Sequence, residues 1–134
     1  MSGGPPPRPE LHPVLSAEER ADLVERGVWL FNAGRFYDCH EAWETVWRST
    51  TPEPRDLWRG LIQIAVGFYH FHGRRRPDVA ARVLRKGARR VEPFAPSSQG
   101  LDLAALLASV DGWIRSLEAG STPRPRVPRL DRVR

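Results

Sequence analysis

Apolar residues recur at helical spacing in five stretches of this chain, and none of these stretches alternates as a β-strand would. The first covers about 17–33 and the second about 35–48, each with its apolar residues on one helical face. Ser16 and Glu19 form an S-x-x-E capping box that marks a helix start, and Gly34 suits a helix end. The pattern therefore predicts an all-α protein.

The third stretch, about 55–72, is apolar almost all round and predicts a buried central helix. Polar side chains interrupt it in one narrow stripe, at Arg59, Gln63 and His70. Gly60 and Gly67 run beside that stripe and indicate a close backbone approach, because an interior glycine otherwise weakens a helix. The fourth and fifth stretches, about 78–92 and 101–118, are amphipathic. Five helices with short connections predict a compact single-domain bundle.

Proline marks the expected domain boundaries, because it lacks an amide donor and restricts the residue before it. Five of the 13 prolines lie in residues 1–13, and three lie in residues 121–134. We therefore predict that both of these segments are disordered. The helical domain is then expected to occupy residues 14–120.

The charge distribution changes this picture little. The 134 residues carry a net charge of +5, of which residues 121–134 supply +4 from five arginines and one aspartate. A basic run around the fourth helix carries a local +7, with only Asp78 against it: Arg74, Arg75, Arg76, Arg82, Arg85, Lys86, Arg89 and Arg90. The helix at 78–92 and the tail leave a nucleic-acid accessory role open, although no aromatic residue interleaves with the run to stack on bases.

The sequence gives limited information on the cellular location of the protein and on whether it forms oligomers. Cys39 is the single cysteine, so no internal disulfide can form. Residues 1–13 lack the apolar run of a secretory signal, and no stretch approaches the ~20 apolar residues that span a bilayer. We therefore expect a cytoplasmic protein with no membrane partner, and homo-oligomer formation stays open.

The candidate chemistry lies on the second and third helices. His40 and Glu44 are four residues apart, so they face the same way on a helix. Imidazole and carboxylate suit a divalent metal such as zinc, manganese, iron or nickel. If these two helices pack antiparallel, His70 comes within reach as a third ligand. Three protein ligands with an open position would suit metal-assisted hydrolysis.

Other polar residues complete this metal-site hypothesis. Glu41 is the candidate catalytic base, and Asn32, Arg59 and Gln63 are candidates for orienting substrate or water. An alternative is that the His/Glu/Gln cluster is a structural hydrogen-bond network in a non-enzymatic interaction module, with Arg59 paired to Glu41 or Glu44. The motif H-E-x-x-E is not the H-E-x-x-H of zinc proteases, so both hypotheses stay open, as does whether the chain is an enzyme.

Two sequence blocks resemble a known family. FNAGRFYDCHEAWETVWR and LWRGLIQIAVGFYHFHGR are similar to the motifs of domain of unknown function 309, over about residues 28–92. The matching positions are Phe31, Asn32, Gly34, Phe36, Tyr37, His40, Glu41, Glu44, Trp47, Gly60, Leu61, Ile62, Gln63, Ala65 and His70. The resemblance implies a compact all-helical bundle. Family members have been labelled predicted metal-dependent hydrolases, which makes that activity an expectation for this chain.

Overall fold

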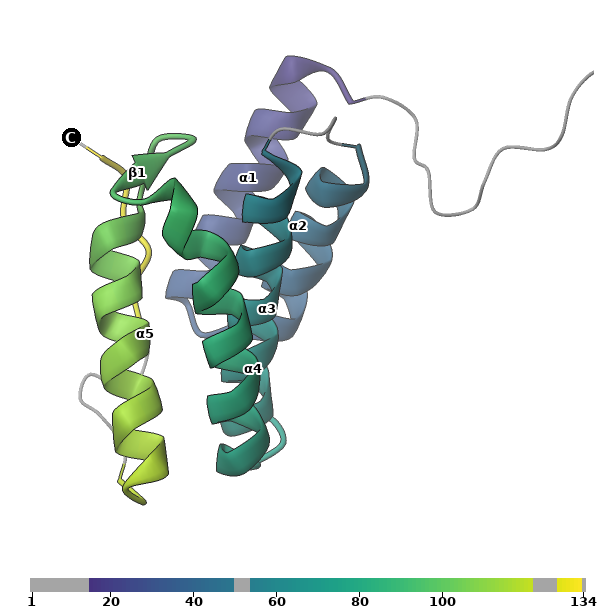
Figure 1. Cartoon of the computed structure of the whole chain (residues 1–134). Helices are drawn as coiled ribbons and strands as arrows, with labels where there is room; N and C mark the ends of the chain where they lie inside the picture. The colour runs from purple at the N-terminus through teal and green to yellow at the C-terminus, as the bar shows by residue number, and fades with distance from the viewer. Residues whose placement is uncertain (1–14, 50–53, 122–127, 134) are drawn as a thin grey trace, which may run out of the picture.

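The computed structural model describes residues 15–49, 54–121 and 128–133, and this part of the chain confirms the all-α class (Figure 1). Its helices are α1 (Ala17–Asn32), α2 (Phe36–Ser49), α3 (Arg55–His72), α4 (Pro77–Val91) and α5 (Leu103–Glu118). The α4–α5 connection contains a 3-10 turn, Glu92–Phe94, and a hairpin of two short strands, β1 (Ser97–Ser98) and β2 (Leu101–Asp102). The hairpin was not expected, because two-residue strands are too short to show alternation.

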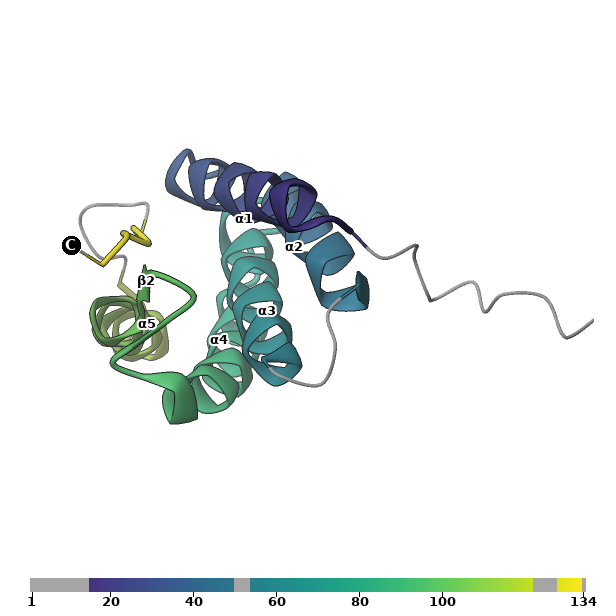
Figure 2. The same cartoon turned by 90° about the horizontal axis from the view of Figure 1, so that it is seen from above.

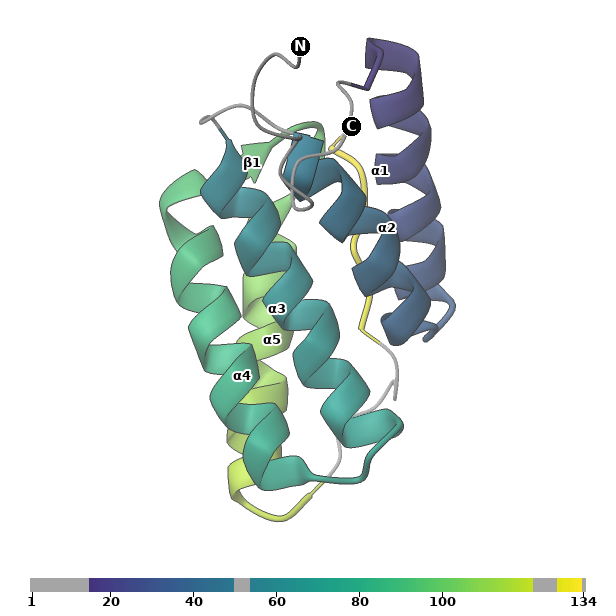
Figure 3. The same ribbon diagram turned by 90° about the vertical axis from the view of Figure 1, so that its right-hand side faces the viewer.

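Helix α3 lies at the centre of the bundle. It packs between α2 and α4, with α1 covering α2 and α5 covering the far side of α4 (Figures 2 and 3). Its side chains Trp58 and Phe68 are fully buried, as are Phe31 of α1 and Trp43 of α2. The expectation from its all-round apolar sequence, a buried central helix, is therefore confirmed.

Glycines let α3 and α4 approach closely. A Cβ on Gly60 would lie 3.0 Å from the Gly87 carbonyl oxygen, and a Cβ on Gly67 would lie 2.7 Å from Leu84 Cγ. Both distances are shorter than ordinary van der Waals contact. The close backbone approach that the sequence indicated is thus present, and α4 is the helix that makes it.

Local signals at the start and end of α1 also hold. Ser16 Oγ accepts a hydrogen bond from the Glu19 N–H at 3.0 Å, and Glu19 Oε1 accepts one from the Ser16 N–H at 2.9 Å. Gly34 takes φ 78°, a left-handed conformation that suits glycine, in the turn before α2. This turn joins the end of α1, which carries Asn32, to the start of α2, which carries Tyr37.

Residues 128–133 pack against the bundle, although the sequence predicted disorder for the whole of 121–134. They run between α1 and the β1–β2 hairpin, as the yellow segment in Figures 2 and 3 shows. Leu130 is completely buried within the hydrophobic core. The sequence did not predict this contact, because the few apolar residues of this proline- and arginine-rich segment show no helical or strand periodicity.

The described helices also bear on two simpler expectations. None of them is long and apolar enough to cross a membrane. Cys39 is buried in the core, and this burial raises the pKa of its thiol well above the usual value. A thiol in that environment is poorly nucleophilic, as expected of a core residue.

Candidate functional site

His40, Glu44 and Arg48 form a continuous polar chain along α2. His40 Nε2 lies 2.8 Å from Glu44 Oε2, and Arg48 Nη2 donates to Glu44 Oε1 at 2.5 Å. On the other side of the ring, His40 Nδ1 lies 3.3 Å from the Tyr37 carbonyl oxygen. The spacing of three and four residues makes these contacts possible within one helix.

The polar chain has a defined chemistry. Both ring nitrogens of His40 face oxygens that accept hydrogen bonds, the Tyr37 carbonyl at Nδ1 and the Glu44 carboxylate at Nε2, so each contact is a hydrogen bond only when the facing nitrogen carries a proton. Glu44 is shared between the imidazole and the Arg48 guanidinium. An open hollow on the surface is lined by these three residues with Glu41 and Thr45. Solvent can therefore reach the ring edge.

His70 does not join His40 and Glu44. A row of rings separates the two histidines: His40 to Tyr37 at 5.5 Å, Tyr37 to Tyr69 at 5.4 Å, and Tyr69 to His70 at 6.2 Å between centroids. Among the residues that the structure describes, no group of three or more His, Cys, Asp or Glu side chains could hold a metal ion. The structure thus brings together two of the three expected ligands.

The surroundings of His70 are cationic rather than acidic. Partial burial lowers the pKa of this imidazole, and the nearby guanidinium groups of Arg74 and Arg76 lower it further. The neutral ring is therefore favoured. Its position at the end of α3 places it next to the basic turn before α4.

The expected substrate-orienting residues are scattered. Arg59 is exposed, so the premise that it sits on a buried face and needs an acidic partner is wrong. Gln63 is half-buried, and its Oε1 is buried without a hydrogen-bond partner within the described part of the chain. Glu41 is exposed beside the hollow. Their expected roles stay predictions.

Asn32 is committed to a different contact. Its Nδ2 donates to the Leu130 carbonyl at 2.9 Å, and its Oδ1 accepts from the Leu130 N–H at 2.8 Å. Both groups of the carboxamide are therefore engaged with a residue 98 positions away. Substrate orientation by Asn32 would require this contact to break.

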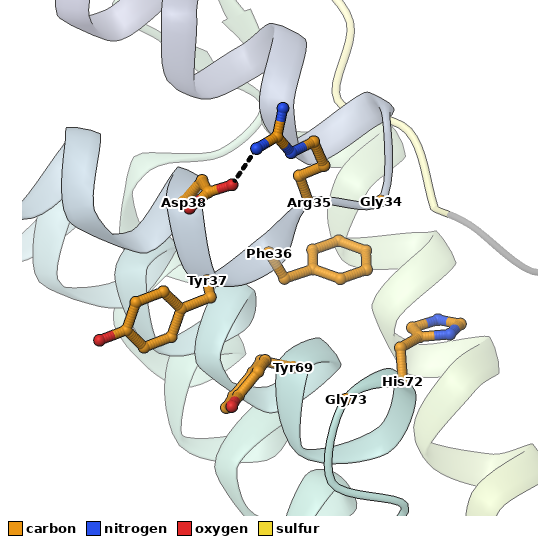
Figure 4. A pocket seen from close by; sticks show the side chains of 8 residues that line it. All are labelled: Gly34, Arg35, Phe36, Tyr37, Asp38, Tyr69, His72 and Gly73. Carbon is orange, nitrogen blue, oxygen red and sulfur yellow. Dashed lines mark hydrogen bonds and ion pairs between the residues drawn. The ribbon is translucent and has the colours of Figure 1, made fainter.

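Sequence reasoning missed a pocket between the α1–α2 turn and the end of α3 (Figure 4). It is lined by Gly34, Arg35, Phe36, Tyr37, Asp38, Tyr69, His72 and Gly73. The Arg35–Asp38 ion pair, at 2.6 Å, lies on one side, and the rings of Tyr37 and Tyr69 lie on another. Tyr37 is 51% exposed.

The basic residues expected to contact nucleic acid are partly neutralised. On α4, Arg85 pairs with Glu118 at 2.7 Å and Arg90 pairs with Asp56 at 2.8 Å. In the described part of the tail, Arg129 pairs with Asp131 at 3.2 Å and Arg132 pairs with Glu25. These four arginines are thus held by carboxylates, which weakens the nucleic-acid hypothesis.

The fold and this polar surface define a small helical bundle with an H-E-x-x-E helix packed against a glycine-containing central helix. Residues 24–83 match the sequence profile of the family described as "Domain of unknown function (DUF309)", so the chain carries this family's domain, as its motifs indicated. The matched range contains Glu25, Asn32 and the polar chain of α2, and it ends before the β2 hairpin.

Two curated relatives are similar to this chain. An uncharacterized protein of Aquifex aeolicus is 25% identical over 111 residues, covering 82% of this chain and 33% of the relative. The uncharacterized protein YpuF of Bacillus subtilis is 34% identical over 95 residues, covering 68% of this chain and 54% of the relative. The chain therefore spans a third of one relative and about half of the other, and neither name states an activity.

Proposed function

We propose that this chain is a non-enzymatic helical interaction module in which the polar chain of α2 is structural. One observation carries the proposal: the Asn32 carboxamide pairs with both backbone groups of Leu130, at 2.8 and 2.9 Å. A side-chain amide offers a donor and an acceptor side by side, as a neighbouring strand does. The helical body therefore holds an extended segment by a means that peptide-binding domains also use.

The arrangement on α2 supports the structural role of its cluster. Every partner of His40 and Glu44 described above lies on that same helix, at a spacing of three or four residues. Pairs of this kind at a partly exposed helix surface each contribute about 0.5 kcal/mol to stability. The cluster then stabilises α2 without needing a ligand.

A metal-dependent hydrolase is the competing function, and one contact favours it. A metal-binding histidine commonly donates its other ring N–H to a carbonyl, and His40 Nδ1 faces the Tyr37 carbonyl oxygen at 3.3 Å. His40 and Glu44 would hold the metal, and Glu41 would act as the base. The donor set does not fit a three-ligand site, however, because His70 lies apart and Arg48 already occupies one oxygen of Glu44.

Replacing His40 by alanine distinguishes these two functions. If the cluster is structural, His40→Ala lowers the melting temperature of chelator-treated protein by about 2 °C, since about 0.5 kcal/mol is lost. Glu41→Ala is the matched control, because Glu41 is exposed on the same helix and lies outside the polar chain. We expect no decrease in melting temperature for it. Near-stoichiometric metal in the untreated protein, lost in His40→Ala, would instead establish the metal site.

A further inference from the structure

Residues 128–133 lie between α1 and the β1–β2 hairpin, which contact the two edges of this extended segment, and we call the space that the segment fills the groove. On one edge, the Asn32 side chain pairs with the Leu130 N–H and C=O. On the other edge, the Asp131 carbonyl accepts from the Asp102 N–H and the Val133 N–H donates to the Gly100 carbonyl, each at 2.9 Å. Alternate residues of a strand direct their backbone groups to opposite edges, so this segment is held as a strand between α1 and β2.

The same groove also contacts two side chains of the segment, Leu130 and Arg132. Leu130 enters the core with no exposed surface. Arg132, two residues later, pairs with the Glu25 carboxylate of α1 and donates to the Gln99 carbonyl at 3.0 Å. Side chains two apart in a strand lie on one face, so the groove selects leucine and arginine at that spacing. The Arg132 side chain remains 42% exposed, and Arg129, Asp131 and Val133 are exposed as well.

We propose that this groove binds, in trans, an extended segment of another protein with leucine and arginine two residues apart, and that residues 128–133 are a competing internal ligand. The inference rests on the proposed function, since it names what the interaction module recognises. The backbone contacts supply affinity independent of sequence, and the apolar slot with Glu25 supplies specificity.

A different protein fits this site better than a second copy of the chain. The tail of a second copy would make the same contacts as the tethered segment, which competes at the millimolar effective concentration of a short linker. A foreign segment can gain contacts that the tail does not make. Trp29 is 64% exposed and lies between Glu25 and Asn32 on one face of α1, at about 100° per residue. Apolar residues at the outward positions of a partner segment would cover it.

The test uses full-length protein whose own segment no longer fits the groove. Leu130→Asp directs a charge into the apolar slot and vacates it. The probe is a fluorescein-labelled peptide with the sequence of residues 122–134, followed by fluorescence anisotropy. Leu130→Ala, in the full-length chain, removes the buried side chain without introducing a charge and vacates the groove by a second route in case Leu130→Asp does not fold.

We expect the peptide to bind the Leu130→Asp chain at least tenfold more tightly than the wild-type chain, in which the internal segment competes. Binding should weaken at least tenfold when the peptide itself carries Asp in place of its leucine, and also when Asn32→Ala is added to the Leu130→Asp chain. A peptide with leucine in place of the residue matching Asp131 should bind more tightly, because it covers Trp29.

Equal affinity of the peptide for wild-type and Leu130→Asp chains, or no binding to either vacated chain, would overturn the inference. Concentration-dependent dimerisation of the wild-type chain that Leu130→Asp abolishes would also overturn it, because the occupant would then be a second copy. These results are distinct from stoichiometric metal bound through His40, which contradicts the proposed function itself.

Discussion

Gly87→Leu is expected to lower the free energy of unfolding by about 3 kcal/mol, because it forces side-chain atoms into the α3–α4 contact. A Cβ at this position would lie 2.8 Å from the Gly60 carbonyl oxygen and 2.9 Å from the Ile64 amide nitrogen. Both are backbone atoms of a central helix, so they cannot rotate away as a flexible side chain can. The helices must separate, which disrupts packing along their length. A shift of the urea unfolding midpoint measures the loss.

Gly112 provides the matched control for this substitution. It also lies within a helix, α5, but a Cβ added there would meet no atom within 4 Å. Gly112→Ala should therefore raise stability by up to about 1 kcal/mol, through helix propensity alone. If Gly87→Leu and Gly112→Ala shifted the midpoint equally, the close α3–α4 approach would be refuted.

Phe68→Ala is expected to cost about 4 kcal/mol, because it removes the ring that joins several helices in the core. Phe68 of α3 is fully buried, and its ring centroid lies 5.3 Å from Phe36 of α2 and 5.3 Å from Trp113 of α5. It also meets Phe31 of α1 edge-on at 5.9 Å. Loss of the ring leaves a cavity that elements anchored on several sides cannot close.

Two controls separate this loss from a general effect of removing an aromatic residue. Phe68→Leu retains most of the apolar volume and should cost no more than about 1.5 kcal/mol. Trp29→Ala removes a larger ring, but Trp29 is 64% exposed, so stability should change by less than about 0.5 kcal/mol. Comparable losses for Phe68→Ala and Trp29→Ala in urea unfolding would contradict the placement of Phe68 at the centre of the core.

Residues of the two family-motif segments make structural contacts in this chain that differ from the roles that the metal hypothesis assigned to them. Asn32 lies in the F-N-x-G segment, where the metal hypothesis assigned it to substrate. In the folded protein it instead pairs with one edge of the 128–133 segment, and the β1–β2 hairpin pairs with the other edge. His40 and Glu44, in the H-E-x-x-E segment, make their paired contact on α2. The two motif segments thus contribute separate contacts rather than one convergent centre.

The helices were predictable because their signals are local. The capping box at Ser16 and Glu19, the turn glycine at Gly34 and the apolar period of each helix act within a few residues of one another. The pairing of His40 with Glu44 was predictable for the same reason, since helical spacing alone brings them together. Gly60 similarly predicted a close approach of another backbone, although the sequence did not indicate that this backbone belongs to α4.

Only the tertiary structure decided which of these residues meet across the bundle. It left His70 apart from His40, because the register between α2 and α3 places two tyrosine rings between them. It exposed Arg59 and joined Asn32 to Leu130, 98 residues away. The sequence by itself determined the helices and the faces they bury, because those depend on neighbours in the chain. Contacts between elements depend on packing and register, which local periodicity does not contain.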